Sequence, residues 1–549
     1  MSNQRLVSRQ QNCSSWTWER KTLLLFVLLF LLKGTFYNLF AIPSHLGTTP
    51  DDVGHFSYVI QLYLEHDIPR WSGEKMEQTA SRNNEDAFYG TLKADETYQL
   101  NLNDYFHENS SANNWISSHP PLYYLYLLPF LSVTALFTTQ LSHILIVFRF
   151  ATTLLGLGTL LCLWGVLRAT KTGKIGSCCV MIAYVFYHSI QFTFSSIDND
   201  AMAVFTASLA FCFFVRYLSD RRVRDLCAFA VAAALIYYSK TSALIVLPVY
   251  ALVFLVDEIF VRRTNFFQML GRGILCLALF ALVCWPLAAQ NMDRYGNLTN
   301  KTIPGIPLAQ LVFPFSGRAS AGAALAEAVA EAEAQPSPLM LLLTRNHYLD
   351  SLARALISVN GWRGQTRAEM PELIAVAAML WLACAYAGGA LAATLKGRRI
   401  WKILLFALLA LVPIVGAWVG SSLLENAFVS CLWFASALWL VPVSMVLAAR
   451  RKQGMILRTC VLSALAVFFY FGFVVYIYHL SHAGGTMIVG MMGRYYYSVI
   501  VPLLWGIFHG LGEGSGEAGG RWTRLLPALL LVGCCFVEIR LLAQGVVIW

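Results

Sequence analysis

Acidic and basic side chains in otherwise apolar surroundings are the residues of this sequence that suit chemistry. They are Asp51, Asp52 and His55, then Asp198-Asn199-Asp200, Lys240 and Gly493-Arg494-Tyr495. A carboxylate can take the proton from an acceptor hydroxyl, and arginine or lysine can bind a phosphate and stabilise it as it departs. These residue types together indicate group transfer from a phosphate ester, provided that the fold brings them together.

The composition places these residues in a membrane protein. Of the 549 residues, 57% are hydrophobic and 13% are charged, whereas soluble domains have about 25% charged residues. The mean hydropathy of +0.58 reflects apolar segments that recur from residue 22 to the C-terminus rather than a single anchor. The composition therefore excludes a soluble enzyme and predicts an all-helical polytopic membrane protein.

The net charge of +10 and the 13 cysteines indicate no further partner. The basic residues lie in short clusters between apolar segments, which is typical of the loops that set membrane topology. The cysteines lie mostly inside apolar stretches and show no metal-ligand spacing. We therefore expect no nucleic-acid partner, no disulfide framework and no zinc module.

The basic clusters predict the topology. They are Arg5/Arg9/Arg20/Lys21, Arg168/Lys171/Lys174, Arg221/Arg222/Arg224, Arg262/Arg263, Lys396/Arg398/Arg399/Lys402, Arg450/Arg451/Lys452 and Arg521/Arg524. By the positive-inside rule each cluster is cytoplasmic. Residues 121–137 are shorter than the roughly 20 residues of a span and begin at a proline pair, so we predict an interfacial helix there.

About thirteen spans follow from this topology, with a cytoplasmic N-terminus and an external C-terminus. They are residues 22–42, 142–167, 175–195, 201–218, 225–239, 241–257, 268–290, 372–395, 402–421, 428–449, 457–478, 495–510 and 525–546.

The predicted spans divide the chain into four parts. Residues 1–21 are a cytoplasmic N-terminus, and residues 22–290 are a seven-span core that includes the external segment 43–141. Residues 291–371 are a second external segment, in which the Ala/Glu-rich stretch 319–334 is predicted to be an amphipathic helix. Residues 372–549 are a C-terminal region of six spans.

With this topology the candidate residues face one compartment, the external one. Charged residues at membrane depth are costly and mark functional sites. Structural roles remain open for each: Asp51 or Asp198 as a helix cap, Lys240 or Arg149 reaching lipid phosphates, and Arg494 as an interfacial anchor. The histidines of the first external segment match no metal-ligand motif. No phosphate-cradling loop for an aqueous nucleotide donor occurs, so we expect an activated donor from the membrane.

Several short motifs, in order, resemble the multi-spanning glycosyltransferase-C superfamily. They are "TTPDDVGHF", "SSHPPLYYLYLLPF", "SSIDNDAMA", "SKTSALIVLP" and "GRYYYSVIVPLL". The sequence is most similar to the branch near the bacterial protein O-mannosyltransferases and the lipid A aminoarabinose transferase. This resemblance implies inverting transfer of a hexose or pentose from a polyprenyl or dolichyl phosphate carrier to an acceptor on the external face.

The resemblance also implies roles for individual residues. Asp51 is the general base, supported by Asp52 and His55, although relatives often show Asp-Glu here, which leaves open which carboxylate is the base. The residues implied to bind the donor are His55, His119, Arg149, Asn199, Asp200, Lys240, Arg494 and Tyr495. Some members need a divalent cation, so a requirement for magnesium or manganese stays open, and no residues are assigned as metal ligands.

Acceptor contacts are predicted in the second external segment, at Tyr348, Trp362 and Arg363, from their position alone. The acceptor class, which is lipid, glycan or protein, is not specified by the sequence. The prediction is a glycosyltransferase of the bacterial inner membrane whose site faces the periplasm, with the endoplasmic reticulum lumen as the alternative. The competing functions are an O-antigen-type polymerase or ligase and a transporter of lipid-linked substrates. A transporter would instead gather charges near mid-membrane.

Overall fold

A computed structural model describes most of the predicted spans. The described residues are 2–42, 49, 51–69, 116, 119–298, 348–357, 368–393, 399–424, 427–449, 453–481, 493–509 and 520–546. Within these ranges every element of regular structure is a helix, as the composition predicts. The Ala/Glu-rich stretch 319–334 and the candidate acceptor residues Trp362 and Arg363 lie outside the described residues.

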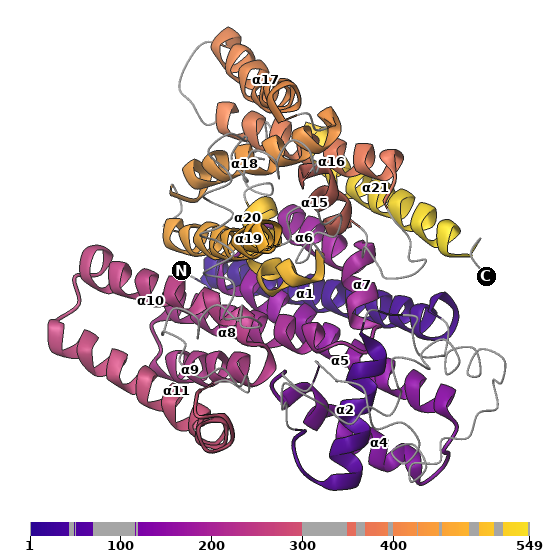
Figure 1. The fold of residues 1–549 in the computed structure, drawn as a ribbon. Coiled ribbons are helices and arrows are strands. Elements are labelled where there is room, and N and C mark those ends of the chain that lie inside the picture. The colour runs from indigo at the N-terminus through magenta and orange to yellow at the C-terminus, as the bar shows by residue number, and fades with distance from the viewer. Residues whose placement is uncertain are drawn as a thin grey trace, which may run out of the picture.

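The N-terminal half of the chain, indigo to magenta in Figure 1, forms the lower part of the molecule in that view. Its elements are α1 (Ser2–Phe36), η1 (Tyr37–Ala41), α2 (Asp52–Glu65), α4 (Leu122–Ala135), α5 (Leu141–Ala169), α6 (Lys174–Phe186), α7 (His188–Phe194), α8 (Asn199–Asp220), α9 (Val223–Ser239), η5 (Thr241–Val246), α10 (Leu247–Val256), η6 (Asp257–Val261) and α11 (Phe266–Tyr295).

The C-terminal half packs on this bundle through α19, α20 and α21. Its elements are α15 (Tyr348–Ile357), α16 (Met370–Ala393), α17 (Arg399–Leu424), α18 (Phe428–Ala449), α19 (Gly454–Ser481), η8 (Gly493–Val499), α20 (Ile500–Phe508) and α21 (Gly520–Val546). Both α20 and α21 contact α6, and η8 contacts α8, so the two halves meet along the centre of the molecule.

Each of the thirteen predicted spans coincides with a helix or with consecutive helices. In the described part of the chain, seven helices are long and apolar enough to cross a membrane, or eight if the bent pair α6–α7 is one span. Shorter apolar stretches include Leu122–Ala135, where an interfacial helix is predicted, and parts of α16, α17 and α18. The protein is thus a polytopic helical membrane protein, while the count of thirteen, the positions of the termini and the division into four parts stay predictions.

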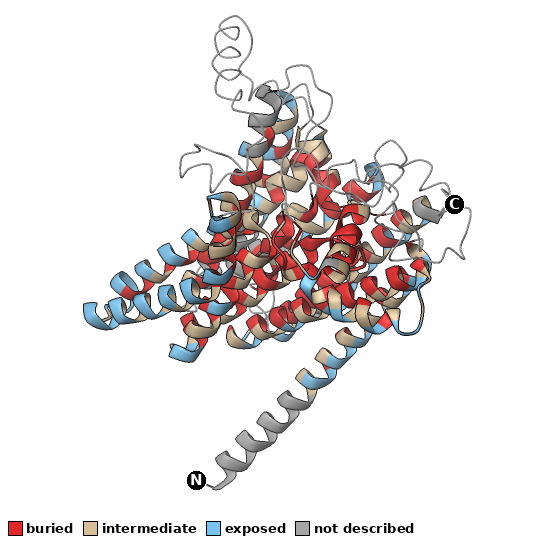
Figure 2. Cartoon of the chain, turned by 60° about the horizontal axis from the view of Figure 1, so that its bottom comes forward, coloured by how far each residue is buried: buried red, intermediate tan, exposed pale blue. Residues whose placement is uncertain are grey.

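Helix α8 lies at the centre of the bundle and α11 at its edge. The most apolar window of α8 is 78% buried inside the protein, whereas that of α11 is 11% buried. Figure 2 shows the same contrast, with buried residues filling the centre and exposed residues on the helices that extend from it. Apolar side chains of α11 therefore face outward, as expected of a helix that contacts lipid. The central position of α8 fixes the residues at its N-terminus.

Close helix packing beside α8 depends on a glycine in α5. A Cβ atom built on Gly156 would lie 2.6 Å from ring atoms of both Phe194 and Phe30. No side chain larger than hydrogen fits this contact without a shift of those rings. Gly156 thus allows α1, α5 and α7 to approach one another.

A second group of buried polar residues joins the first and last spans. Lys33 Nζ lies 2.9 Å from Glu538 Oε2, and Tyr37 donates to the other oxygen of that carboxylate. The Tyr37 hydroxyl also contacts His188 Nδ1 at 2.7 Å, just after the 57° bend between α6 and α7. Since each charged group here has an opposite partner, the group connects α1, η1, α7 and α21 within the apolar bundle.

Candidate functional site

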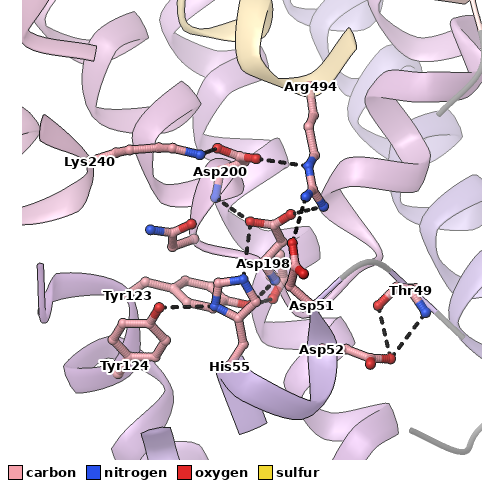
Figure 3. Close-up of polar contacts among 12 residues, drawn as sticks. Thr49, Asp51, Asp52, His55, Tyr123, Tyr124, Asp198, Asp200, Lys240 and Arg494 are labelled. Carbon is pink, nitrogen blue, oxygen red and sulfur yellow. Dashed lines mark hydrogen bonds and ion pairs between the residues drawn. The ribbon is translucent and has the colours of Figure 1, made fainter. Parts of the chain in front are cut away.

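Side chains far apart in sequence meet where four elements begin. Asp51 immediately precedes α2, Asp198 and Asp200 lie at the start of α8, Lys240 separates α9 from η5, and Arg494 is the second residue of η8. Figure 3 shows these five side chains converging, with Arg494 between the carboxylates. The structure thus brings together the acidic and basic residues on which the predicted chemistry depends.

Arg494 is the centre of this cluster. Its guanidinium donates to Asp198 Oδ2 at 2.5 Å and to Asp51 Oδ2 at 2.9 Å. Its Nε lies 3.2 Å from Asp200 Oδ2 in an ion pair, and among the described residues neither of these two atoms has a hydrogen-bond partner. Burial acts to lower the pKa of Arg494, but the carboxylates, Asp198 foremost, raise it well above its ordinary value. Arg494 is therefore a permanently charged group.

Lys240 lies on the other side of Asp200. It forms an ion pair and hydrogen bond with Asp200 Oδ1, and its ammonium lies 4.7 Å from the centre of the Tyr495 ring. Burial acts to lower the pKa of Lys240, but Asp200 and its neighbours raise it overall. A small pocket opens between these groups, lined by Asp200, Lys240, Ser242, Phe471, Arg494, Tyr495 and Ser498. Its wall carries two fixed positive charges beside an aromatic ring.

The start of α8 explains why two carboxylates are held there. The carboxylate of Asp198 caps the helix by accepting from the Asp200 backbone N–H at 2.9 Å, as aspartate commonly does at this position. The helix dipole further stabilises negative charge in the first turn. Asp198 therefore has the capping role that the sequence left open for it, and the same carboxylate also binds Arg494.

His55 connects α2 to this cluster. Its Nε2 lies 3.6 Å from Asp198 Oδ1, and its Nδ1 lies 2.9 Å from the Tyr124 hydroxyl. The ring also stacks near His119, with 6.1 Å between the ring centres. Burial lowers the pKa of His55 against the opposing effect of Asp198 and Asp51. His55 is thus a neutral ring that lines the acidic side of the cluster.

The adjacent residues Asp51 and Asp52 have different surroundings. Asp51 has a left-handed backbone, with φ of 61°, and its side chain makes no helix-capping hydrogen bond, so the capping role that remained open for it is wrong. The Asp51 side chain is 29% exposed, whereas Asp52 is 2% exposed. Asp52 Oδ2 accepts from the backbone N–H and the hydroxyl of Thr49, at 3.1 and 3.2 Å. Asp51 therefore faces the cluster, and Asp52 holds the turn before α2.

The remaining predicted residues lie beside the cluster or apart from it. Asn199 donates to the Ser239 carbonyl at 3.4 Å, which joins α8 to the residue before Lys240. Arg149 is not brought to Arg494; it donates to the Ile42 carbonyl at 3.0 Å, where the first span ends. Tyr348 begins α15 and hydrogen-bonds Tyr496 of η8. The binding roles predicted for these residues stay predictions.

Tyr123 and Tyr124 are site residues that the sequence analysis did not name, and Asp198 was named there but not among the donor-binding residues. The Tyr123 hydroxyl accepts from the Asp198 backbone N–H at 3.1 Å and contacts Thr152 at 2.8 Å. Both tyrosines lie on the first turn of α4, immediately after the His-Pro-Pro sequence. The position of the two tyrosines next to the His-Pro-Pro sequence could have indicated them, since the same motif contains the predicted donor-binding residue His119.

The cluster suits proton transfer and anion binding. It holds three carboxylates and two cations that cannot all be paired one to one. One carboxylate is thus in excess, which a base requires, and the two cations are of the type that binds a phosphate. Among the described residues, no group of three His, Cys, Asp or Glu side chains is arranged to hold a metal ion.

The fold and the cluster together define a polytopic helical membrane protein with a buried ion-pair site at the ends of several helices. The chain belongs to the membrane-protein family DUF2142, described as a predicted membrane protein, whose model matches residues 35–311. This match includes every element of the cluster except η8. No curated protein matches the sequence.

The comparison with solved structures found helical membrane proteins of low sequence identity. A crystal structure of the Archaeoglobus fulgidus oligosaccharyltransferase with zinc and sulfate has a TM-score of 0.45 and 11% identity, covering 95% of this chain and 52% of that chain. A crystal structure of ArnT from Cupriavidus metallidurans bound to undecaprenyl phosphate has a TM-score of 0.34 and 12% identity, covering 88% of this chain and 77% of that chain. The chain thus spans about half the length of the oligosaccharyltransferase.

Proposed function

We propose that the protein is an integral-membrane glycosyltransferase that moves a sugar from a polyprenyl phosphate carrier to an acceptor hydroxyl. The observation that carries this proposal is the contact between the partly exposed Asp51 carboxylate and Arg494, beside a pocket that also contains Lys240. A base and a phosphate site thereby share one arginine. The motif order of the glycosyltransferase-C superfamily supports the same reaction.

The donor phosphate takes the place of Asp51 on Arg494. Asp198 and Asp200 are both buried and hold the guanidinium from within the protein, whereas Asp51 contacts it from the exposed side. An entering phosphate competes for the outer N–H groups of Arg494 and for Lys240, because both cations form strong hydrogen bonds with phosphate oxygens. The displaced Asp51 carboxylate loses its positive partner, which makes it a stronger base.

The proposed reaction is a single inverting displacement. Asp51 accepts the proton of the acceptor hydroxyl while that oxygen forms a bond to the anomeric carbon of the sugar. The bond between the anomeric carbon and the phosphate oxygen breaks, and its electron pair leaves with the polyprenyl phosphate. Arg494 and Lys240 stabilise the negative charge that develops on this phosphate. The products are the glycosylated acceptor, the free lipid phosphate and protonated Asp51.

The proposed partners and location follow from the same topology. The donor is dissolved in the bilayer, and the acceptor reaches the cluster from the external face, as the basic clusters predict for the starts of α2, α8 and η8. We place the protein in a bacterial inner membrane with a periplasmic site. The sugar, the acceptor class and a need for a divalent cation are for the assay to identify.

Donor binding and transfer test this proposal directly. Purified protein in detergent is titrated with undecaprenyl phosphate and then assayed for transfer of radiolabelled sugar from undecaprenyl phosphate. We expect Lys240→Met to weaken lipid-phosphate binding about tenfold or more, since one charged hydrogen bond contributes roughly 1.5–3 kcal/mol. Lys174→Met, at the start of α6, is the matched control and retains wild-type affinity. Equal affinity of wild type and Lys240→Met would contradict a phosphate site in this pocket.

A further inference from the structure

The end of helix α15 is held by residues of the N-terminal half of the chain. The last carbonyls of a helix have no partner within the helix itself, and in α15 other elements approach them. Tyr187 donates to the Leu356 carbonyl, and Ser189 donates to the Ile357 carbonyl at 2.6 Å. Both donors lie at the bend between α6 and α7. The bend therefore aims two hydroxyl groups at one helix end.

The same helix end contacts η8, which carries Arg494. Tyr497 of η8 donates to the Leu356 carbonyl at 3.3 Å. Gly493 packs so closely that a Cβ atom built on it would lie 1.9 Å from the Ala355 carbonyl oxygen. The obstacle is backbone, which cannot rotate aside, so only glycine fits here. The residue immediately before Arg494 is thus pressed against α15.

These contacts leave η8 held from two directions. On one side Arg494 is bound by Asp198 and Asp200 at the start of α8. On the other side Gly493 and Tyr497 rest on the end of α15, which is buried at Ala355 and Ile357. A shift of α15 would therefore move the backbone that carries the guanidinium.

We propose that Tyr187, Ser189 and Gly493 are positioning residues for Arg494, which they orient through the C-terminal carbonyls of α15. Helix α15 begins at Tyr348, one of the predicted acceptor contacts. Helix α15 and the pocket beside Arg494 are consequently coupled through one helix end. The consequence for donor binding rests on the proposed function, whereas the mechanical coupling does not.

Hydrogen exchange of the intact protein in detergent tests the mechanical part. The variant is Tyr187→Phe/Ser189→Ala, which removes two hydroxyl groups and introduces no clash. The matched control is Tyr184→Phe, which removes a tyrosine hydroxyl that donates to the Gly156 carbonyl at 2.8 Å in the same bent pair. We expect the backbone amides of residues 493–499 to exchange about tenfold faster in the double variant and unchanged in the control. Unchanged exchange in the double variant, or an equal increase in the control, overturns the proposal.

A double-mutant cycle tests whether the effect passes through Arg494. Affinity for undecaprenyl phosphate is measured for Tyr187→Phe/Ser189→Ala with Arg494 intact and with Arg494→Lys. We expect about tenfold weaker binding with Arg494 and no further loss with lysine, because a lysine lacks the fixed planar fork that positioning serves. Equal losses in both backgrounds mean general loosening and overturn the proposal. If wild type binds no lipid phosphate, the proposed function fails, while the exchange experiment still decides the role of α15.

Discussion

Replacing each of the two adjacent aspartates by asparagine separates the base from the structural carboxylate. Asp51 is partly exposed and faces Arg494, so Asp51→Asn removes the proposed proton acceptor and leaves the helix start intact. General-base catalysis contributes about 10²–10⁴-fold, which is roughly 3–5 kcal/mol of barrier at about 1.4 kcal/mol per tenfold. We therefore expect the rate of sugar transfer to fall by that factor, with lipid-phosphate affinity equal to or tighter than that of wild type because a competitor for Arg494 has lost its charge.

For Asp52→Asn we expect a loss of stability rather than a loss of transfer rate. Its carboxylate accepts two hydrogen bonds from Thr49 while buried, and an amide oxygen accepts them more weakly. The expected loss is about 1–3 kcal/mol of unfolding free energy, with the transfer rate per folded molecule retained. Transfer and binding are measured with radiolabelled donor, and stability by thermal unfolding in detergent.

Asp67→Asn is the matched control for both variants. Asp67 pairs with Arg294 at 2.6 Å at the other end of α2, and its side chain is 47% exposed. We expect this variant to transfer sugar like wild type. The reasoning is refuted if Asp51→Asn transfers as fast as Asp67→Asn, or if Asp52→Asn alone abolishes transfer in a fully folded protein. The polymerase, ligase and transporter alternatives would then move ahead of a glycosyltransferase with an aspartate base.

Three further predictions concern stability. Burial lowers the pKa of His55 below its ordinary 6.5, so the unfolded chain binds a proton more readily than the folded one. The free energy of unfolding therefore falls as the pH drops below about 6.5. The difference in unfolding midpoint between wild type and His55→Gln should shrink from pH 7.5 to 5.5, and parallel pH curves of the two proteins would count against this. Lys33→Met or Glu538→Leu alone leaves a buried charge unpaired and should lower the free energy of unfolding by roughly 3–5 kcal/mol. The double variant should be more stable than either single variant, and a double variant whose loss equals the sum of the two single losses would contradict the pairing. Gly156→Ala should cost about 1–3 kcal/mol, and Gly271→Ala, where a Cβ meets no atom within 4 Å, should cost nothing; equal unfolding midpoints would show that the rings move aside.

The apolar helices were predictable because their cause is local. A run of apolar residues forms a helix in a membrane whatever its neighbours are, since every backbone group must be hydrogen-bonded within the segment. The basic clusters between the runs mark their ends in the same local way. For this reason all thirteen predicted spans coincide with helices, including the short Val223–Ser239 and the broken pair at Lys174–Phe194.

The pairings within the cluster were not predictable from local pattern. Arg494 and Asp198 are 296 residues apart, and no periodicity in the sequence relates them. The predicted topology placed the acidic and basic residues of the cluster on one face of the membrane. It also placed Arg149 there, but the Arg149 guanidinium donates to the Ile42 carbonyl at the end of the first span. The different roles of Asp51 and Asp52 depend on the left-handed backbone at Asp51, which a pair of identical residues does not reveal.

The choice of base follows from what each carboxylate already binds. Asp198 caps α8 and holds Arg494, and Asp200 is shared between Lys240 and Arg494. A carboxylate that accepts several charged hydrogen bonds is a poor proton acceptor, because protonation would break them. Asp51 makes one side-chain contact among the described residues, and that contact is with the arginine for which a phosphate competes. In the proposed reaction, binding of the donor phosphate to Arg494 would thus free Asp51 as the base, so proton transfer from the acceptor would be favoured when the leaving group is in place.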